Sequence, residues 1–106
     1  MKPFELEDTF LLSKILEDLD IELDLNDFLE KIKNEKDAEK VGGQFFYLLF
    51  KKWNKGRKSI PEFIASLSEK SVEEVNKMKL PELKEFFVEL FKQEGIQDFF
   101  KSASEE

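Results

Sequence analysis

The chain has 106 residues, with twelve phenylalanines, no histidine and no cysteine, and its formal net charge at pH 7 is −7. The missing residue types exclude disulfides, thiolate nucleophiles, imidazole bases and zinc sites built from His or Cys. The composition therefore favours a protein-binding module over an enzyme, and we expect no catalytic residue, no cofactor and no metal site.

The charge is distributed unevenly along the chain. Residues 1–39 carry a net charge of −8, residues 40–58 carry +6 without any acid, and residues 59–106 carry −5. An acidic balance disfavours nucleic acid as a partner. The N-terminus, Met1 to Glu5, lacks the apolar run of a signal peptide, and no apolar stretch approaches the roughly 20 residues of a membrane span. We therefore expect a cytoplasmic protein without a membrane partner.

The first predicted helix covers residues 8–19, where an apolar stripe recurs at helical spacing. Asp8 or Thr9 is the expected N-cap. The stripe consists of Leu12, Ile15, Leu16 and Leu19. In residues 20–26, Ile21, Leu23 and Leu25 alternate with acids, which we interpret as an extended linker; the alternative is a strand that pairs with another copy.

Two further helices are predicted over residues 25–34 and 38–54. The second of these is apolar over more than half of its circumference, so it should be surrounded by other helices or offer surplus surface to a partner. Gly42 and Gly43 lie inside it and cost about 1 kcal/mol each relative to Ala. They mark either a break between two helices or the close approach of another backbone, and the sequence leaves both open.

The last third of the chain predicts three more helices, after Gly56 as a C-cap. Ser59 with Glu62, and Ser71 with Glu74, match the S-x-x-E capping box and begin short helices over residues 60–67 and 71–78. A helix over residues 81–93 follows, with Pro81 in its first turn. The sequence thus predicts an all-α fold. It is a single small domain of about six short helices around a Phe-rich core in residues 1–101, followed by a disordered polar tail in residues 102–106.

The phenylalanines supply the first candidate site. Most of the rings are expected in the core, but three adjacent pairs widen the apolar faces rather than deepen them. Rings left over would form an exposed apolar patch, which marks a protein-binding site. The positions that we expect to remain exposed are Phe45, Phe46, Phe50, Phe99 and Phe100, and Trp53 joins them as a candidate protein-binding residue.

A basic cluster supplies the second candidate site, an electrostatic contact. Its members are Lys51, Lys52, Lys55, Arg57 and Lys58, which surround Trp53. Cations collect at the C-terminus of a helix because its partial charge is negative, and this is the first interpretation. The others are a contact with an acidic partner or with the acidic part of another copy, and a single-strand platform built on Trp53.

The order of segments resembles one known family. The leading helix carries residues 10–16, FLLSKIL; the Phe-rich middle helix covers residues 44–53; and the last third carries residues 71–83, SVEEVNKMKLPEL, and 96–102, IQDFFKS. In these segments the chain resembles the tail assembly chaperones of long-tailed phages and prophages of Gram-positive bacteria. The resemblance implies an all-helical, cytoplasmic protein that coats the apolar, helical tape-measure protein until tail-tube subunits polymerise around it. It also implies self-association as an option.

Two other functions remain open from the sequence. A small helical regulatory or inhibitor adaptor would bind one protein partner with fixed stoichiometry. A nucleic-acid binder would use the bases from Lys51 to Lys58 and would show salt-sensitive affinity.

Overall fold

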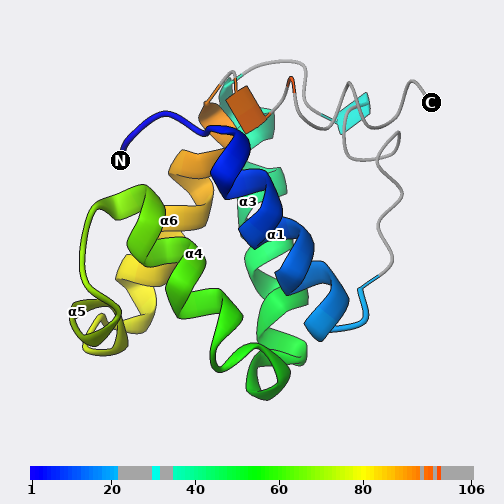
Figure 1. The fold of residues 1–106 in the computed structure, drawn as a ribbon. Coiled ribbons are helices and arrows are strands. Elements are labelled where there is room, and N and C mark those ends of the chain that lie inside the picture. The colour runs from blue at the N-terminus through cyan, green and yellow to red at the C-terminus, as the bar shows by residue number, and fades with distance from the viewer. Residues whose placement is uncertain (22–29, 32–34, 94, 97, 99–106) are drawn as a thin grey trace.

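The structure is a computed structural model, and it describes residues 1–21, 30–31, 35–93, 95–96 and 98. Within these residues the prediction of an all-α domain is confirmed, and no strand is present. The helices in chain order are α1 (Leu6–Asp18), α3 (Glu35–Lys51), the short 3₁₀ helix η1 (Trp53–Gly56), α4 (Ser59–Ser68), α5 (Val72–Asn76) and α6 (Leu80–Lys92) (Figure 1).

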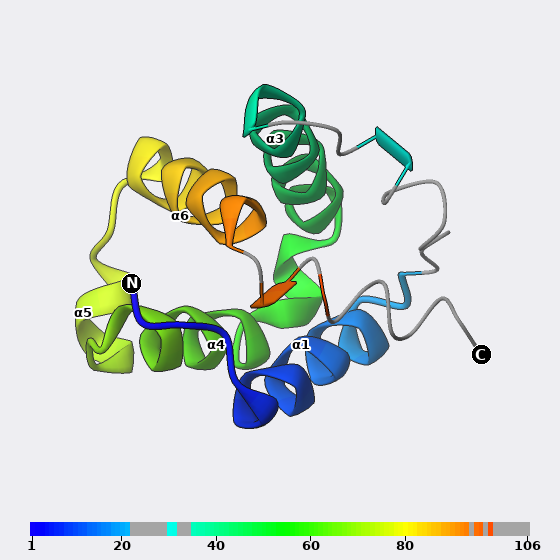
Figure 2. The ribbon, with the colours of Figure 1, turned by 90° about the horizontal axis from the view of Figure 1, so that it is seen from above.

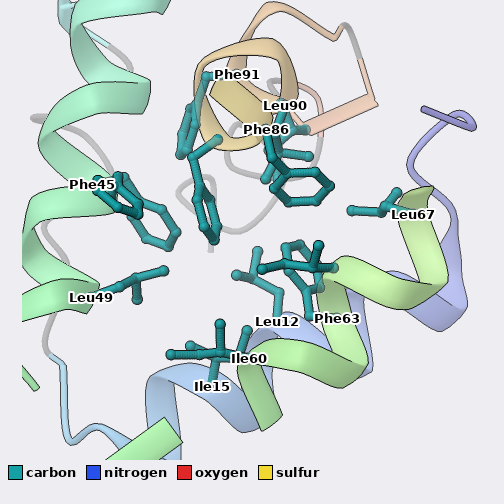
Figure 3. Packing of buried hydrophobic residues seen from close by; sticks show 14 of the residues in the cluster. Leu12, Ile15, Phe45, Leu49, Ile60, Phe63, Leu67, Phe86, Leu90 and Phe91 are labelled. Carbon is teal, nitrogen blue, oxygen red and sulfur yellow. The ribbon is translucent and has the colours of Figure 1, made fainter. Parts of the chain in front are cut away.

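The helices form two layers. In one layer α3 packs along α6, which is the largest contact between helices, and in the other α1 packs against α4, which also carries α5 (Figure 2). The apolar stripes of both layers meet in the middle, where Phe45, Leu49 and Phe91 face Leu12, Ile15, Ile60 and Phe63 (Figure 3). The radius of gyration of 12.9 Å is what a compact chain of this length adopts, about 13 Å.

Phenylalanine rings fill much of this core. The Phe45 ring lies 5.2 Å from the Phe91 ring and 5.9 Å from the Phe87 ring, measured between centroids. Phe86 meets Phe63 edge to face at 6.2 Å, which connects the two layers. Such pairs add about 0.5–1.5 kcal/mol each to the free energy gained by burying the rings. The expectation that most rings are core therefore holds among the described residues.

Gly42 and Gly43 do not break the central helix, because α3 is continuous from Glu35 to Lys51. A Cβ atom at Gly42 would lie 2.7 Å from the carbonyl oxygen of Phe87 and 2.7 Å from the Cα atom of Val88. The close approach of another backbone, one of the two alternatives, is thus the correct one. Gly42 lets α6 reach α3 at a distance that any side chain would prevent.

Several predicted helix ends are wrong. The first helix begins at Leu6 rather than Asp8, because Asp8 is its third residue and its carboxylate accepts a hydrogen bond of 3.0 Å from the Glu5 N–H. Gly56 is not a left-handed C-cap; α3 ends at Lys51, and Gly56 is buried where a Cβ would lie 2.7 Å from Leu19. The helix predicted over 25–34 and the linker over 20–26 lie mostly outside the described residues, as does the tail over 102–106.

The two predicted capping boxes have opposite outcomes. Ser71 and Glu74 form the box, with the Glu74 N–H donating to the Ser71 hydroxyl at 3.1 Å. Ser59 does not cap α4, because it is already the first helical residue; its hydroxyl is buried and has no protein partner. The pattern S-x-x-E alone does not fix the residue at which a helix begins.

The N-terminal residues tie the layers together at one end. The Lys2 N–H donates to the Leu67 carbonyl at 2.9 Å, and the Phe4 N–H donates to Gln93 Oε1 at 3.0 Å, so residues 2–4 link the ends of α4 and α6. Lys92 of α6 also pairs with Glu39 of α3 at 2.8 Å, and this hydrogen bond raises the pKa of Lys92.

None of the described helices has both the length and the apolar character needed to cross a bilayer.

Candidate protein-binding surface

The outer side of α3 carries two exposed aromatic side chains. Tyr47 and Phe50, three residues apart, are 56% and 49% exposed, and the half-buried Trp53 follows three residues later. Tyr47 and Phe50 share one face of α3, and Trp53, in η1 beyond the end of α3, packs against the Phe50 ring. We call Tyr47, Phe50 and Trp53 the aromatic row.

Contacts below the surface hold two members of the row in place. The centroid of the Phe46 ring lies 6.2 Å from that of Phe50 and 5.8 Å from that of Trp53, and Phe50 and Trp53 are 5.9 Å apart. Phe46 in turn packs on the core ring of Phe87 at 5.8 Å. The exposed rings are thus continuous with the core, which reduces the entropy that they would lose on binding a partner.

The prediction that Phe45 and Phe46 are exposed is wrong. Phe45 is fully buried, and Phe46 is 8% exposed. Phe45 shares a face with Val41 and Leu49, four residues away on each side, and this face is the one that α6 covers. Phe46 lies 100° further round and still reaches Phe87. Phe50 is exposed as predicted, whereas Phe99 and Phe100 lie outside the described residues.

A hollow of about 670 Å³ opens beside the end of the row, and Trp53 forms part of its wall. Its exposed lining is more polar than apolar: Asn54, Arg57 and Asn76 line it beside Met78 and Leu83, whereas Ile60, Ile64 and Val75 are buried and contribute little exposed surface. Its volume is within the range of about 300–1,000 Å³ that is typical of binding pockets. The hollow can accept a side chain from a partner.

The predicted basic cluster follows the row directly. Lys51 lies with its Nζ atom 5.0 Å from the centre of the Tyr47 ring, and Lys55, Arg57 and Lys58 are exposed. Lys52 is only half-exposed, because its Nζ atom donates to the carbonyl oxygen of Asp20 at 2.9 Å. Lys51 lies over Tyr47 and Arg57 lines the hollow with Trp53, and Lys55 and Lys58 are their neighbours in the chain. We call the aromatic row and these four exposed bases the basic aromatic surface. Its members are Tyr47, Phe50, Lys51, Trp53, Lys55, Arg57 and Lys58.

The sequence patterns did not predict the exposure of Leu6, Phe10 and Tyr47, among other apolar side chains. Tyr47 shares a face of the predicted helix over residues 38–54 with Lys51 and Asn54, and polar neighbours on a face indicate that this face is exposed to solvent. Leu6 and Phe10 of α1 are 71% and 67% exposed, on the side opposite to the buried stripe. The spacing to Leu12 was the available signal for Phe10, since two residues turn a helix by 200°.

The burial of Asp8 was also not predicted, and the contacts of its carboxylate indicate that it stabilises the fold. The carboxylate has no exposed surface and accepts hydrogen bonds from Lys2 Nζ at 2.6 Å, from Ser66 Oγ at 2.8 Å and from the Glu5 N–H at 3.0 Å. Burial acts to raise the pKa of the Asp8 carboxyl, but these hydrogen bonds outweigh it, so the pKa lies below its ordinary value of 3.8. A buried, fully paired carboxylate is poorly placed to act on a substrate.

The described residues contain no group of three or more acidic side chains arranged to hold a metal ion. What the basic aromatic surface offers is apolar contact, aromatic stacking and positive charge, which are the means by which proteins recognise other macromolecules. In the comparisons with known proteins, no family model, no curated protein and no solved structure matches the chain.

Proposed function

We propose that the chain is a non-enzymatic phage tail assembly chaperone that binds and solubilises the tape-measure protein during tail assembly, in the cytoplasm of the host cell. The proposal combines the resemblance of segment order with one structural observation. That observation is the aromatic row, in which Tyr47 and Phe50 are exposed and the half-buried Trp53 packs against Phe50 and lines the hollow.

The geometry suits an apolar helix as the partner. A bound helix presents side chains at intervals of three and four residues, and an aromatic row of the same spacing next to a hollow can receive them. The exposed area is small, so a single copy would bind weakly and reversibly. Many separate copies could bind along one long partner, each at its own site, and together they would cover its apolar surface. Release would then require only local competition.

Co-expression with the tape-measure protein of the same phage or prophage tests the proposal. We expect a soluble complex that contains many copies of the chain for each tape-measure molecule, measured by size-exclusion chromatography with light scattering. Phe50→Asp should return the tape measure to the insoluble fraction, because it places a charge in the aromatic row. Val72→Asp is the matched control, since Val72 is an exposed apolar residue on α5 outside the row.

Three results would contradict the proposal. One is an insoluble tape measure beside a folded, unbound chain. A complex that survives Phe50→Asp unchanged would place the contact elsewhere. A complex with one copy for one partner molecule would favour the regulatory adaptor instead.

A further inference from the structure

The hollow beside Trp53 combines a cation with apolar side chains. Arg57 lines it, together with the half-buried Met78 and Leu83. None of the described residues that line it is acidic, although 24 residues of the chain are Asp or Glu. The hollow is therefore suited to a ligand that is apolar and also carries a negative charge.

Two other hollows in the described residues have a different charge balance. One of about 710 Å³ lies beside the N-terminal segment, where Lys92 is accompanied by Glu89 and Asp98. The other, of about 410 Å³, is lined by two lysines together with Glu30 and Asp37. Neither has an excess of positive charge, so the acid-free lining is not a general property of this surface.

Arg57 has no acidic partner within the described part of the chain. Its side chain is exposed, and the ion pairs there involve other residues. The acids of the neighbouring α5 are engaged elsewhere, since Glu73 lies 3.9 Å from Lys77 and Glu74 accepts a hydrogen bond from the Ser71 N–H. The guanidinium of Arg57 is thus available to a carboxylate from outside, which can accept two parallel hydrogen bonds from it.

We propose that Arg57 selects the partner: the helix that binds here carries a carboxylate three or four residues from the apolar side chain that enters the hollow, and Arg57 binds this carboxylate. Such intervals place two side chains on one face of a helix. The apolar side chain then contacts Met78 and Leu83, and the carboxylate reaches Arg57. This inference rests on the proposed function, because it takes the partner to be an apolar helix, and it adds the charge that this helix must carry.

The charge of the rest of the chain favours an isolated carboxylate over a strongly acidic partner. Lys55 and Lys58 are exposed neighbours of Arg57 in the chain, and residues 40–58 carry +6. Residues 1–39 and 59–106, in contrast, carry −8 and −5, and they repel a long acidic segment. Complementary charge of this kind contributes more to the choice of partner than to the affinity.

Three designed peptides test the inference on the full chain. Each is a tryptophan-free helix of about 20 residues with one apolar stripe, and the residue four positions after its central leucine is glutamate, glutamine or lysine. Trp53 lines the hollow, so its emission reports binding there and not on the acidic parts of the chain, which also attract a basic peptide. At about 50 mM salt the glutamate peptide should bind about tenfold more tightly than the glutamine peptide, and the lysine peptide should bind most weakly.

Substitutions of Arg57 identify its role. Arg57→Gln should lower the affinity for the glutamate peptide about tenfold, to that of the glutamine peptide. Arg57→Glu should reverse the preference, so that the lysine peptide binds best, and a merely structural role of Arg57 cannot produce a reversal. Lys84→Gln is the matched control, because Lys84 is an exposed base of α6 outside the surface, and it should keep the wild-type preference.

Four results would overturn the inference. The first is equal binding of the three peptides to the wild type, and the second is the absence of any Trp53 response to the glutamate peptide. The third is a preference for glutamate that survives Arg57→Gln. The fourth is an equal loss in Lys58→Gln, which removes a base that does not line the hollow and would assign the preference to the general field of the cations.

Co-expression with the tape-measure protein separates this inference from the proposed function. Arg57→Glu should return the tape measure to the insoluble fraction. A tape measure kept soluble equally well by the wild type and by Arg57→Glu would overturn the role of Arg57 and leave the chaperone function standing. A tape measure that stays insoluble beside a wild-type chain that prefers the glutamate peptide would overturn the chaperone function alone.

Discussion

At the scale of single residues, Asp8 shows how a buried charge stabilises this fold. Its carboxylate joins the start of α1 to Lys2 and to Ser66 of α4, so one side chain fixes three segments. Removing the charge leaves Lys2 with only the exposed Glu5 as an acidic partner and weakens two further hydrogen bonds. Breaking a paired, buried carboxylate costs about 3–5 kcal/mol when both partners are buried. Lys2 is one-fifth exposed, which places this pair toward the lower end.

We therefore expect Asp8→Asn to lower the free energy of unfolding at pH 7 by roughly 2–4 kcal/mol, measured by urea denaturation. The pKa of Asp8 is lowered in the folded state, so its contribution is present above the unfolded pKa and is lost as the pH falls through the folded pKa. The difference between wild type and variant should therefore shrink in acid, below pH 3.8.

The matched control for Asp8 is Glu5→Gln. Glu5 Oε1 lies 3.6 Å from the same Lys2 Nζ, but the Glu5 side chain is 65% exposed. Its loss should cost less than about 1 kcal/mol, because solvent screens exposed ion pairs. Two outcomes would contradict a stabilising role for the buried Asp8 carboxylate. One is an equal loss of unfolding free energy in Asp8→Asn and Glu5→Gln, and the other is a difference between wild type and Asp8→Asn that does not depend on pH.

The end of α4 offers a stabilising substitution. Glu69 is the C-cap and has a φ of 57°, in the left-handed region that favours glycine. Glu69→Gly should raise the free energy of unfolding by about 0.5–1 kcal/mol, since the strain of a side chain there exceeds the added entropy of the unfolded chain. Thermal denaturation would measure this as a rise of a few degrees in Tm. Glu69→Ala keeps a Cβ atom and should bring no such gain; an equal rise in Tm would argue against strain.

At the scale of helices, the pair of glycines in α3 separates packing from helix propensity. Gly42→Ala would place a methyl group 2.7 Å from the backbone of α6, so the two helices would have to separate, at a net cost of about 1–3 kcal/mol. Gly43→Ala meets only the end of the Lys84 side chain at 3.9 Å and should stabilise the chain by about 1 kcal/mol. Denaturant unfolding of both variants checks this. Similar effects from the two substitutions would refute the close approach.

Most helices could be predicted from the sequence, because their apolar stripes and breakers are strong local signals. The helices expected over 60–67 and 81–93 correspond to α4 (Ser59–Ser68) and α6 (Leu80–Lys92). The errors occur where tertiary contacts decide. Serine is favoured at N-caps, but Ser59 is the first residue of α4 and is buried. Glycine is favoured at C-caps, but Gly56 is needed because a side chain there would collide with Leu19.

The candidate site could be predicted only in part. The sequence pointed to Phe50, Trp53 and the exposed bases, because aromatic and basic residues are concentrated there. It could not tell which rings of the central helix would be covered, since that depends on the position of α6. The glycine at position 42 brings α6 against the face of Phe45, and the face of Tyr47 stays open. The exposure of Leu6 and Phe10 was not predicted, because they lie opposite the buried stripe that dominates the apolar pattern of α1.

At the scale of the whole molecule, the charge distribution argues against nucleic acid as the partner. The basic aromatic surface belongs to a chain with a net charge of −7, which repels a polyanion beyond the local patch. We expect no binding of labelled single-stranded DNA at about 0.15 M salt, measured by fluorescence anisotropy. A salt-sensitive affinity that vanishes when Lys51, Lys52 and Lys55 become Glu would contradict this and favour the nucleic-acid function.

The most direct test of the basic aromatic surface uses the fluorescence of Trp53, the only tryptophan of the chain. Trp53 is half-buried beside the hollow, so a helix that binds there must change the surroundings of its ring. A tryptophan-free helical peptide from the tape-measure protein, titrated into the chain, should shift the Trp53 emission to shorter wavelength in a saturable way, and Phe50→Asp should abolish the shift. If the peptide binds by calorimetry while the Trp53 emission stays constant, the partner binds elsewhere, and the basic aromatic surface is not the site.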